Sequence, residues 1–330
     1  MKFIPKILSK PPKTKNFVVL EIGLGRVNIA IFEQSEKNSE NNLEQSKTEK
    51  KFVGVGRRSF GTADTILDAT LEATDALGAI VDELPHPGLV GVSGGQLEAG
   101  TTVAKYERED PKSPINQEEL SGVLEKVALK EKDGYKVFFS AITGGRIDGN
   151  KVTNPVGVKG KSAEINCFVA YKPSEELAAY DKIIEELELK PVKIMPTAFA
   201  VAQMLITKET SSYLLLRVGV NKTEASQVHE GHLVRVSNFD VGAEQLEFLN
   251  LGIEVVLEKQ EEKERCQGIW LYSDSEEVDL GEVKKEINKV DWKKKFKLDN
   301  FEIKEEVGMD KFGPSDSGIL ALSEQERSQL

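Results

Sequence analysis

The sequence predicts an α/β fold built from two similar strand-hairpin units. Residues 16–32 form the first unit, in which two apolar, β-branched runs flank a turn that contains Gly23 and Gly25. The same order of features, an apolar strand, a glycine-containing turn and further strands, returns over residues 213–239. Segments with apolar residues at helical spacing lie between the two units. A hairpin that occurs twice, with helices between its copies, indicates two related lobes.

The other elements follow from hydrophobic periodicity and from turn residues. Residues 34–51 are polar and predict a surface loop. Apolar runs predict strands at residues 52–60, 89–92, 136–142, 163–171, 191–195 and 270–272. Helical spacing predicts helices at residues 62–84, 174–189 and 198–206, a helix that starts near residues 116–119, and a Lys-rich helix or linker at 283–296.

Composition restricts the class of protein and of partner. A chain of 330 residues is long enough for two domains. Its net charge of -11 argues against a nucleic-acid partner, because acidic surfaces repel phosphates. Its two cysteines, Cys167 and Cys266, give no disulfide framework and favour a reducing compartment. The cysteines and three dispersed histidines have no metal-site spacing, so no metal site is expected.

The first fifteen residues reverse the charge of the rest of the chain. They carry five lysines and no acidic residue. Apolar residues stand among these lysines at helical spacing, and such a segment can lie on an anionic membrane surface. The alternative is a solubilising tail, which Pro5 favours. The membrane-binding candidates are Phe3, Ile4, Lys6, Ile7, Leu8 and Lys10.

Both hairpins have the order of residues that can handle a phosphate group. Glycines let backbone N–H groups approach phosphate oxygens, and an acidic residue at the strand end can hold Mg²⁺. Two such hairpins that face each other could grip one nucleotide. The candidate residues are Glu21, Gly23, Gly25 and Arg26 in the first hairpin and Arg217, Gly219 and Thr223 in the second.

Several passages make the chain resemble FtsA, the actin-like cell-division protein. Residues 20–30 are similar to that family's first phosphate motif, and residues 90–95 to the strand that ends its first lobe. The most specific passage is Arg146-Ile147-Asp148-Gly149, followed by Asn-Pro-Val-Gly at residues 154–157. PilM, a pilus-assembly relative with the same architecture, is the second choice.

The resemblance implies a domain organisation. It predicts an actin-like fold of two lobes, each an RNase H-like unit, with an inserted α+β subdomain of the SHS2 type. Lobe one would span residues 16–96 and 165–190, the insert 97–164, and a shortened lobe two 191–330, after a basic tail at 1–15. In the family, the insert mediates contacts between subunits.

The chain also departs from the family's nucleotide motifs. Glu21 stands where the family has Asp, and Arg26 follows the first turn in place of a hydroxyl residue. Arg217 replaces the second acidic residue, and residues 268–274 lack the glycine pair that contacts adenosine. Because Mg²⁺-dependent hydrolysis needs a bound metal and a positioned water, these changes predict a pseudo-ATPase with no cofactor.

The resemblance implies an adaptor that links a division filament to the membrane. Its expected partners are an FtsZ-like filament protein, an anionic membrane surface and other copies of the chain, which would associate through the insert. The expected location is the inner face of the cell membrane, as a peripheral protein. Two alternatives stay open: a divergent ATPase that binds ATP with Mg²⁺ through Glu21 and Arg217, and a PilM-like scaffold of a pilus-assembly system.

Overall fold

The computed structural model describes most of the chain between residues 14 and 325. The described residues are 14–37, 47–62, 65–128, 133–205, 212–230, 232–260, 266–298, 300–305 and 316–325. The predicted membrane-binding residues, Phe3, Ile4, Lys6, Ile7, Leu8 and Lys10, lie outside this part. The middle of the surface loop predicted at residues 34–51 also lies outside it, and the prediction is wrong at both ends of that range, because residues 34–37 and 47–51 are strand.

The first hairpin belongs to a five-stranded sheet with the order β3-β2-β1-β4-β9. β1 (Thr14–Ile22) pairs antiparallel with β2 (Arg26–Lys37) and parallel with β4 (Pro87–Val92). β3 (Lys47–Ser59) extends the hairpin, and β9 (Lys190–Pro196) completes the parallel side. We call this sheet, with α1 (Ile66–Asp75) and α3 (Ser174–Glu186), lobe one.

The second hairpin repeats the topology of the first. β10 (Tyr213–Val218) pairs antiparallel with β11 (Thr223–His229), which pairs with β12 (His232–Phe239). On its other side, β10 pairs parallel with β13 (Gly268–Tyr272), which pairs parallel with β14 (Glu302–Glu305). The order β12-β11-β10-β13-β14 therefore matches β3-β2-β1-β4-β9 strand for strand. Lobe two consists of these strands with α5 (Leu246–Glu258), α6 (Leu280–Ile287) and α7 (Trp292–Phe296).

The register shows how closely the two units correspond. Glu21 pairs with Asn28 in the first hairpin, and Arg217 pairs with Glu224 in the second. The members of each equivalent pair, Glu21 with Arg217 and Asn28 with Glu224, stand 196 residues apart. The predicted duplication is confirmed.

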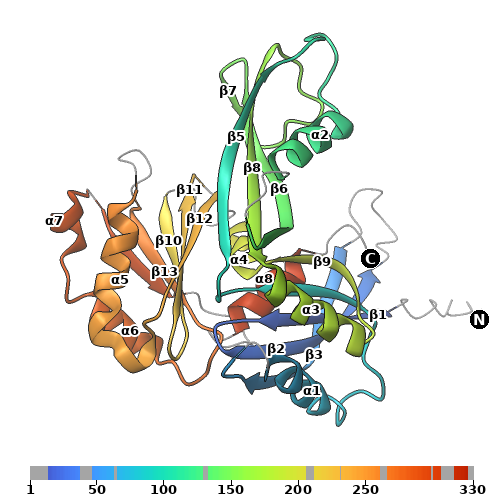
Figure 1. Cartoon of the computed structure of the whole chain (residues 1–330), viewed down its shortest axis with the longest axis vertical. Coiled ribbons are helices and arrows are strands. Elements are labelled where there is room, and N and C mark those ends of the chain that lie inside the picture. The colour runs from blue at the N-terminus through green and yellow to red at the C-terminus, as the bar shows by residue number, and fades with distance from the viewer. Residues whose placement is uncertain are drawn as a thin grey trace, which may run out of the picture.

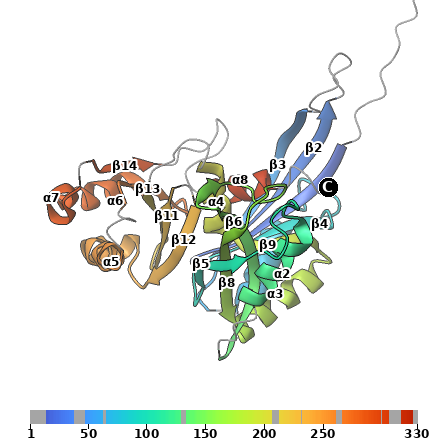
Figure 2. The same ribbon diagram turned by 90° about the horizontal axis from the view of Figure 1, so that it is seen from above.

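The helices make alternating layers with the two sheets. α1 and α3 cover the outer face of the first sheet, where they pack on Val18, Leu20 and Ile22. α4 (Thr197–Leu205) and α8 (Ser317–Glu324) lie between the sheets, against Phe17, Val19 and Leu215 among others. α5 and α6 cover the outer face of lobe two. Figures 1 and 2 show the two lobes on either side of α4 and α8.

A separate unit projects from the junction of the lobes. It contains β5 (Glu98–Glu107), α2 (Gln117–Ala128), β6 (Tyr135–Ile147), β7 (Asn150–Val152) and β8 (Ser162–Pro173). β5 pairs with β12 at Ala99 and Gly100, so the strands of this unit continue the sheet of lobe two. Figure 1 shows the unit as the upper part of the molecule. We call it the insert.

The structure moves several predicted boundaries. β8 runs to Pro173, so residues 165–173, expected in lobe one, belong to the insert strand. β9 lies in the sheet of lobe one, and α8 contacts β1 and β4, so the expected range 191–330 for lobe two begins too early and ends too late. These corrections share one cause: a chain segment joins whichever sheet buries its apolar side chains, and sequence order does not specify that sheet.

Some helices and strands also differ in length or number. The helix predicted at 62–84 ends at Asp75 and continues as turns near Gly78. The segment 283–296 forms two helices, because the Asp291 side chain accepts a hydrogen bond from the Lys294 N–H and starts α7. β6 continues through Gly144 and Gly145, beyond the strand predicted at residues 136–142. α5 was not predicted from the sequence.

Candidate functional site: an ion-pair cluster between the hairpins

Strand alternation places Glu21 and Arg217 on the same side of the molecule. Successive side chains of a strand point to opposite faces. Phe17 and Val19 face the layer between the sheets, so Glu21 faces it too. Tyr213 and Leu215 do the same in β10, and they direct Arg217 inward. The ends of two equivalent strands therefore meet at the interface of the lobes.

Arg217 forms ion pairs with carboxylates from both lobes. Its Nη2 atom lies 3.0 Å from Glu21 Oε1 and 2.8 Å from Asp274 Oδ2. Its Nη1 atom donates a hydrogen bond to the Ser93 hydroxyl, and its guanidinium lies over the ring of Tyr272 at 5.9 Å. Arg217 is completely buried. A buried guanidinium with two carboxylates and a hydroxyl around it holds the two lobes together through charge-assisted contacts.

The contacts across the interface follow the duplication. Asn28 of β2 donates to Glu21 Oε2 at 3.1 Å and lies 3.5 Å from the Asp274 carbonyl oxygen in lobe two. Its equivalent in lobe two, Glu224, accepts a hydrogen bond of 2.9 Å from the Gly94 N–H of lobe one. Each lobe thus reaches with its second strand to the loop after the parallel strand of the other lobe.

The first turn has its backbone N–H groups engaged already. The Gly23 N–H donates to the Arg26 carbonyl at 2.8 Å, and the Gly25 N–H donates to the Gly23 carbonyl at 3.0 Å. Between them, the Leu24 N–H donates to Asp274 Oδ2 at 3.0 Å. The N–H groups that a phosphate would need in this turn therefore already have protein acceptors.

The two glycine turns pack directly against each other. A Cβ atom on Gly219 would lie 3.0 Å from Cβ of Leu24, so the Leu24 side chain rests on the second turn. A Cβ atom on Gly23 would lie 2.1 Å from Asp274 Oδ2 and 2.4 Å from Arg217 Nη2. Gly23 is therefore required for close approach to the ion pair. Gly25 is required by its backbone, which has a φ of 92°.

The site residues predicted from the sequence lie in three places. Glu21, Gly23, Gly25, Arg217 and Gly219 come together at the interface. Arg26 lies at the rim, where its Nη1 donates to the Ser275 hydroxyl at 2.9 Å. Thr223 is buried within lobe two and donates its hydroxyl to the Val241 carbonyl at 2.6 Å, so this hydroxyl is bonded within its own lobe.

Four polar residues of the cluster were not predicted as site residues: Asn28, Ser93, Glu224 and Asp274. Two of them could have been found, because Asn28 and Glu224 interrupt otherwise apolar strands at equivalent positions of the repeat. Ser93 and Asp274 are also equivalent, since Ser93 stands two residues after Gly91, the partner of Glu21, and Asp274 stands two residues after Tyr272, the partner of Arg217. Their convergence depends on sheet order, which no local pattern encodes.

Burial dominates the electrostatics of the cluster. Burial raises the pKa of Glu21, although the nearby Arg217 opposes this, and it raises the pKa of Glu224 for the same reason. Burial would lower the pKa of Arg217, but Asp274 and Glu21 outweigh it and raise the pKa overall. The guanidinium therefore stays protonated, and desolvation is expressed in the raised pKa values of Glu21 and Glu224.

The cluster does not suit a Mg²⁺–nucleotide group of the kind that the resemblance implies. The cation between the hairpins is the Arg217 guanidinium, which would repel Mg²⁺. Within the described residues, no group of three His, Cys, Asp or Glu side chains is placed to hold a metal ion.

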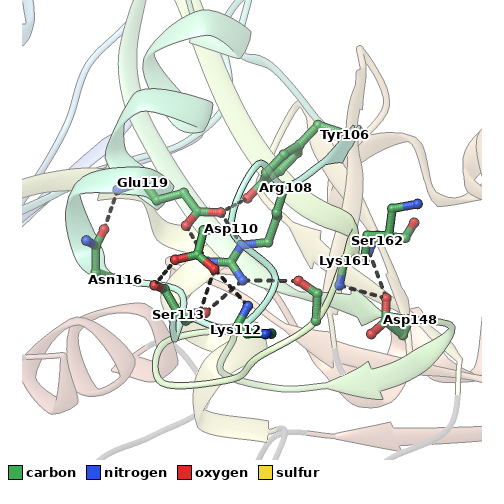
Figure 3. A network of polar contacts seen from close by, with 11 residues as sticks. Tyr106, Arg108, Asp110, Lys112, Ser113, Asn116, Glu119, Asp148, Lys161 and Ser162 are labelled. Atoms are coloured by element: carbon green, nitrogen blue, oxygen red, sulfur yellow. Dashed lines mark hydrogen bonds and ion pairs between the residues drawn. The ribbon is translucent and has the colours of Figure 1, made fainter.

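The Asp-Gly and Asn-Pro passages that suggested FtsA build the tip of the insert. Asp148 accepts hydrogen bonds from the N–H groups of Lys161 and Ser162, at 2.9 and 2.8 Å. Nearby, Arg108 binds both carboxylate oxygens of Glu119, at 2.8 and 2.9 Å (Figure 3). The Asp148 bonds join the turn after β6 to the start of β8, and the Gly157 N–H donates to the Ile115 carbonyl at 2.8 Å, so both passages have a structural role in the insert.

Comparison with known proteins gives the fold a name. No model of a protein family matches the sequence, and no curated protein matches it. Among solved structures, the chain is similar to a PilM-PilN type IV pilus biogenesis complex, with a TM-score of 0.57 and 11% identity over 93% of this chain and 97% of that one. The chain has the actin-like ATPase fold.

A Bacteroides thetaiotaomicron protein with that fold and unknown function has a TM-score of 0.46, with 11% identity over 93% of this chain and 95% of that one. The cytoplasmic domain of EpsL, from the type II secretion system of Vibrio cholerae, scores 0.43, with 9% identity over 96% of both chains.

The actin-like fold explains why the cluster lies where it does. In a duplicated fold, the two hairpin turns face each other across the lobes, and this chain places opposite charges at the equivalent strand ends. Among the described residues, the helices are too short or too polar to cross a membrane.

Proposed function

We propose that the chain is an actin-like scaffold protein in which a buried arginine takes the place of a nucleotide-bound metal. The observation that carries the proposal is Arg217, whose guanidinium lies between Glu21 of lobe one and Asp274 of lobe two. In such a protein, the closed arrangement of the lobes is maintained by its own side chains. Such a protein acts by binding other proteins and does not depend on ATP hydrolysis.

The proposal extends to a membrane-associated assembly. The similarity to a structure described as a pilus biogenesis complex supports a PilM-like scaffold, with partners in a membrane system. The alternative is the FtsA-like adaptor, which would bind an FtsZ-like filament, an anionic membrane surface and, through the insert, other copies of itself. Both place the protein at the inner face of the membrane, with the basic segment at residues 1–13 as the contact.

Titration calorimetry with ATP tests the nucleotide part of the proposal. We expect no binding heat from ATP, with or without Mg²⁺, because protein groups occupy the N–H donors of the first turn and the space beside Arg217. Mg²⁺-dependent binding would overturn the proposal and favour the divergent ATPase.

Two further experiments separate the assemblies. The first is co-sedimentation with anionic liposomes. Deletion of residues 1–13 should remove most of the protein from the liposome pellet, and an unchanged amount in the pellet would exclude this segment as the membrane contact. The second is a pull-down in which this protein is immobilised. It should retain a purified PilN-type protein and should not retain a purified FtsZ-type protein.

A further inference from the structure

The insert contains a groove that lies far from the ion-pair cluster. The groove runs between the outer part of β5 and the helix α2, and it has a volume of about 630 Å³. Its floor and walls are mainly apolar, with Ala104 and Tyr106 on the strand side and Val123 and Val127 on the helix side. Figure 1 shows α2 beside the projecting strands, away from both lobes.

One wall of the groove is a strand edge with unpaired backbone. Within the described residues, β12 pairs with β5 at Ala99 and Gly100 only, whereas β8 pairs with β5 along its whole length. From Thr102 to Glu107, β5 therefore has a neighbour on one side. An edge strand presents N–H and C=O groups that another extended chain can pair with.

The other wall contains a glycine that the fold itself does not require. Gly122 stands in the middle of α2, where glycine costs about 1 kcal/mol relative to alanine. A Cβ atom on Gly122 would have nothing within 4 Å. No close packing inside the chain therefore demands glycine, and the residue leaves the helix wall open toward the groove. Glycine is the residue that allows close approach of another chain.

The ends of the groove carry opposite charges. Glu118 lies at the start of α2 and Lys126 near its end, and both side chains are exposed. Their separation on the helix is about 12 Å, which about four residues of extended chain would span. The groove thus complements an extended segment with a basic residue at one end, an acidic residue at the other and apolar residues between them.

The groove walls are held in position before any partner arrives. The Tyr106 hydroxyl donates to Glu119 at 2.8 Å, and Arg108 binds the same carboxylate through two hydrogen bonds (Figure 3). These contacts fix the strand to the helix at the acidic end. A preformed groove lowers the entropy lost on binding.

We infer that the groove between β5 and α2 binds an extended segment of a partner protein by strand addition to β5. The backbone of the segment pairs with residues 102–107, and alternate side chains enter the groove over Gly122. The segment is apolar in its middle, with a basic residue near Glu118 and an acidic residue near Lys126. This inference is independent of the ion-pair cluster and of whether nucleotide binds.

The test uses the full chain and a phage-displayed library of short random peptides as the probe. Peptides selected on the protein are then measured by fluorescence anisotropy with two variants. Gly122→Leu fills the groove without an internal clash and improves helix propensity, so it should fold and weaken binding about tenfold or more. Glu125→Leu adds the same side chain to the exposed face of α2, outside the groove, and should leave binding unchanged.

Hydrogen exchange and a charge reversal provide independent readouts. Bound peptide should slow amide exchange at residues 102–107, because strand addition gives these groups partners. Lys126→Glu should weaken the binding of peptides with an acidic end. It should strengthen the binding of peptides in which that acidic residue is replaced by lysine.

Three outcomes would overturn the inference. They are a selection that yields no peptide, peptides that bind Gly122→Leu as well as the unmodified chain, and self-association of the chain that Gly122→Leu abolishes. The last would identify the occupant as a second copy of this protein.

Discussion

At the scale of single residues, the central feature is an inversion of charge at one duplicated position. Glu21 and Arg217 occupy equivalent places in their hairpins and form an ion pair at 3.0 Å. A buried ion pair gains little net stability, because desolvation offsets much of the attraction. Removing one partner is costly, since it leaves the other charge buried alone. Arg217 has two buried carboxylates to compensate, so its loss matters more than that of either acid.

Replacing Arg217 by alanine should therefore destabilise the protein strongly. We expect the free energy of unfolding to fall by about 3–5 kcal/mol, measured by urea denaturation. The double variant Glu21→Gln with Arg217→Met removes both opposite charges and should recover part of this loss. A loss below 1 kcal/mol for Arg217→Ala would contradict the burial of the pair.

Stability should depend on pH through Glu224. Burial raises the pKa of Glu224 above its ordinary value of 4.5, although Arg217 and the Gly94 N–H oppose the change. Between the unfolded and the folded pKa, the folded state binds more protons than the unfolded state. The contribution of this group to the free energy of unfolding therefore falls as pH rises from about 4.5 through the folded pKa.

The variant Glu224→Gln tests this dependence. It removes the titrating group and keeps an oxygen acceptor for the Gly94 N–H. Denaturation between pH 5 and pH 8 should give a smaller fall in stability for the variant than for the unmodified chain. Some fall should remain, because burial raises the pKa of Glu21 as well. Equal slopes would show that Glu224 has an unshifted pKa.

At the scale of elements, the two glycine turns have become packing surfaces. Gly23 lies against Asp274 and Arg217, so Gly23→Ala would force these side chains apart and should cost about 1–3 kcal/mol. Gly61→Ala is a matched control, because a Cβ atom there would meet nothing within 4 Å. Thermal unfolding should lower the melting temperature of the first variant and leave that of the second nearly unchanged. Similar values for both variants would argue against close packing at Gly23.

Elements with a clear pattern were predictable, and those with a mixed pattern were not. The strands around Gly23 and Gly219 are apolar runs that end at glycine, and both were found from the sequence. α5 was not predicted; its side chains Phe248, Leu251 and Val255 are exposed, so the helix is apolar on its outer face as well as on its buried face. Glu21 and Arg217 were recognised singly as departures from a motif. Their pairing depends on two sheets that face each other, and local sequence does not encode that arrangement.

At the scale of the whole molecule, the ion-pair cluster adds a charged link between two lobes that each have a core of their own. Lobe one has its own core between the first sheet and α1 and α3, and lobe two has one between its sheet and α5 and α6. The layer of α4 and α8 connects the two sheets by apolar contact, and Arg217 adds charged contacts at one end of this layer. Lobes with separate cores can unfold separately unless the interface couples them.

Arg217 should therefore control how cooperatively the protein unfolds. Trp270 and Trp292 both belong to lobe two, so their fluorescence reports that lobe, while far-ultraviolet circular dichroism reports both. In the unmodified chain, the two urea transitions should coincide. In Arg217→Met, which keeps most of the side-chain volume without the charge, they should separate, because the lobes lose their charged link. Coincident transitions in the variant would mean that the apolar layer of α4 and α8 couples the lobes by itself. Arg217 would then contribute to stability without determining how the lobes act together.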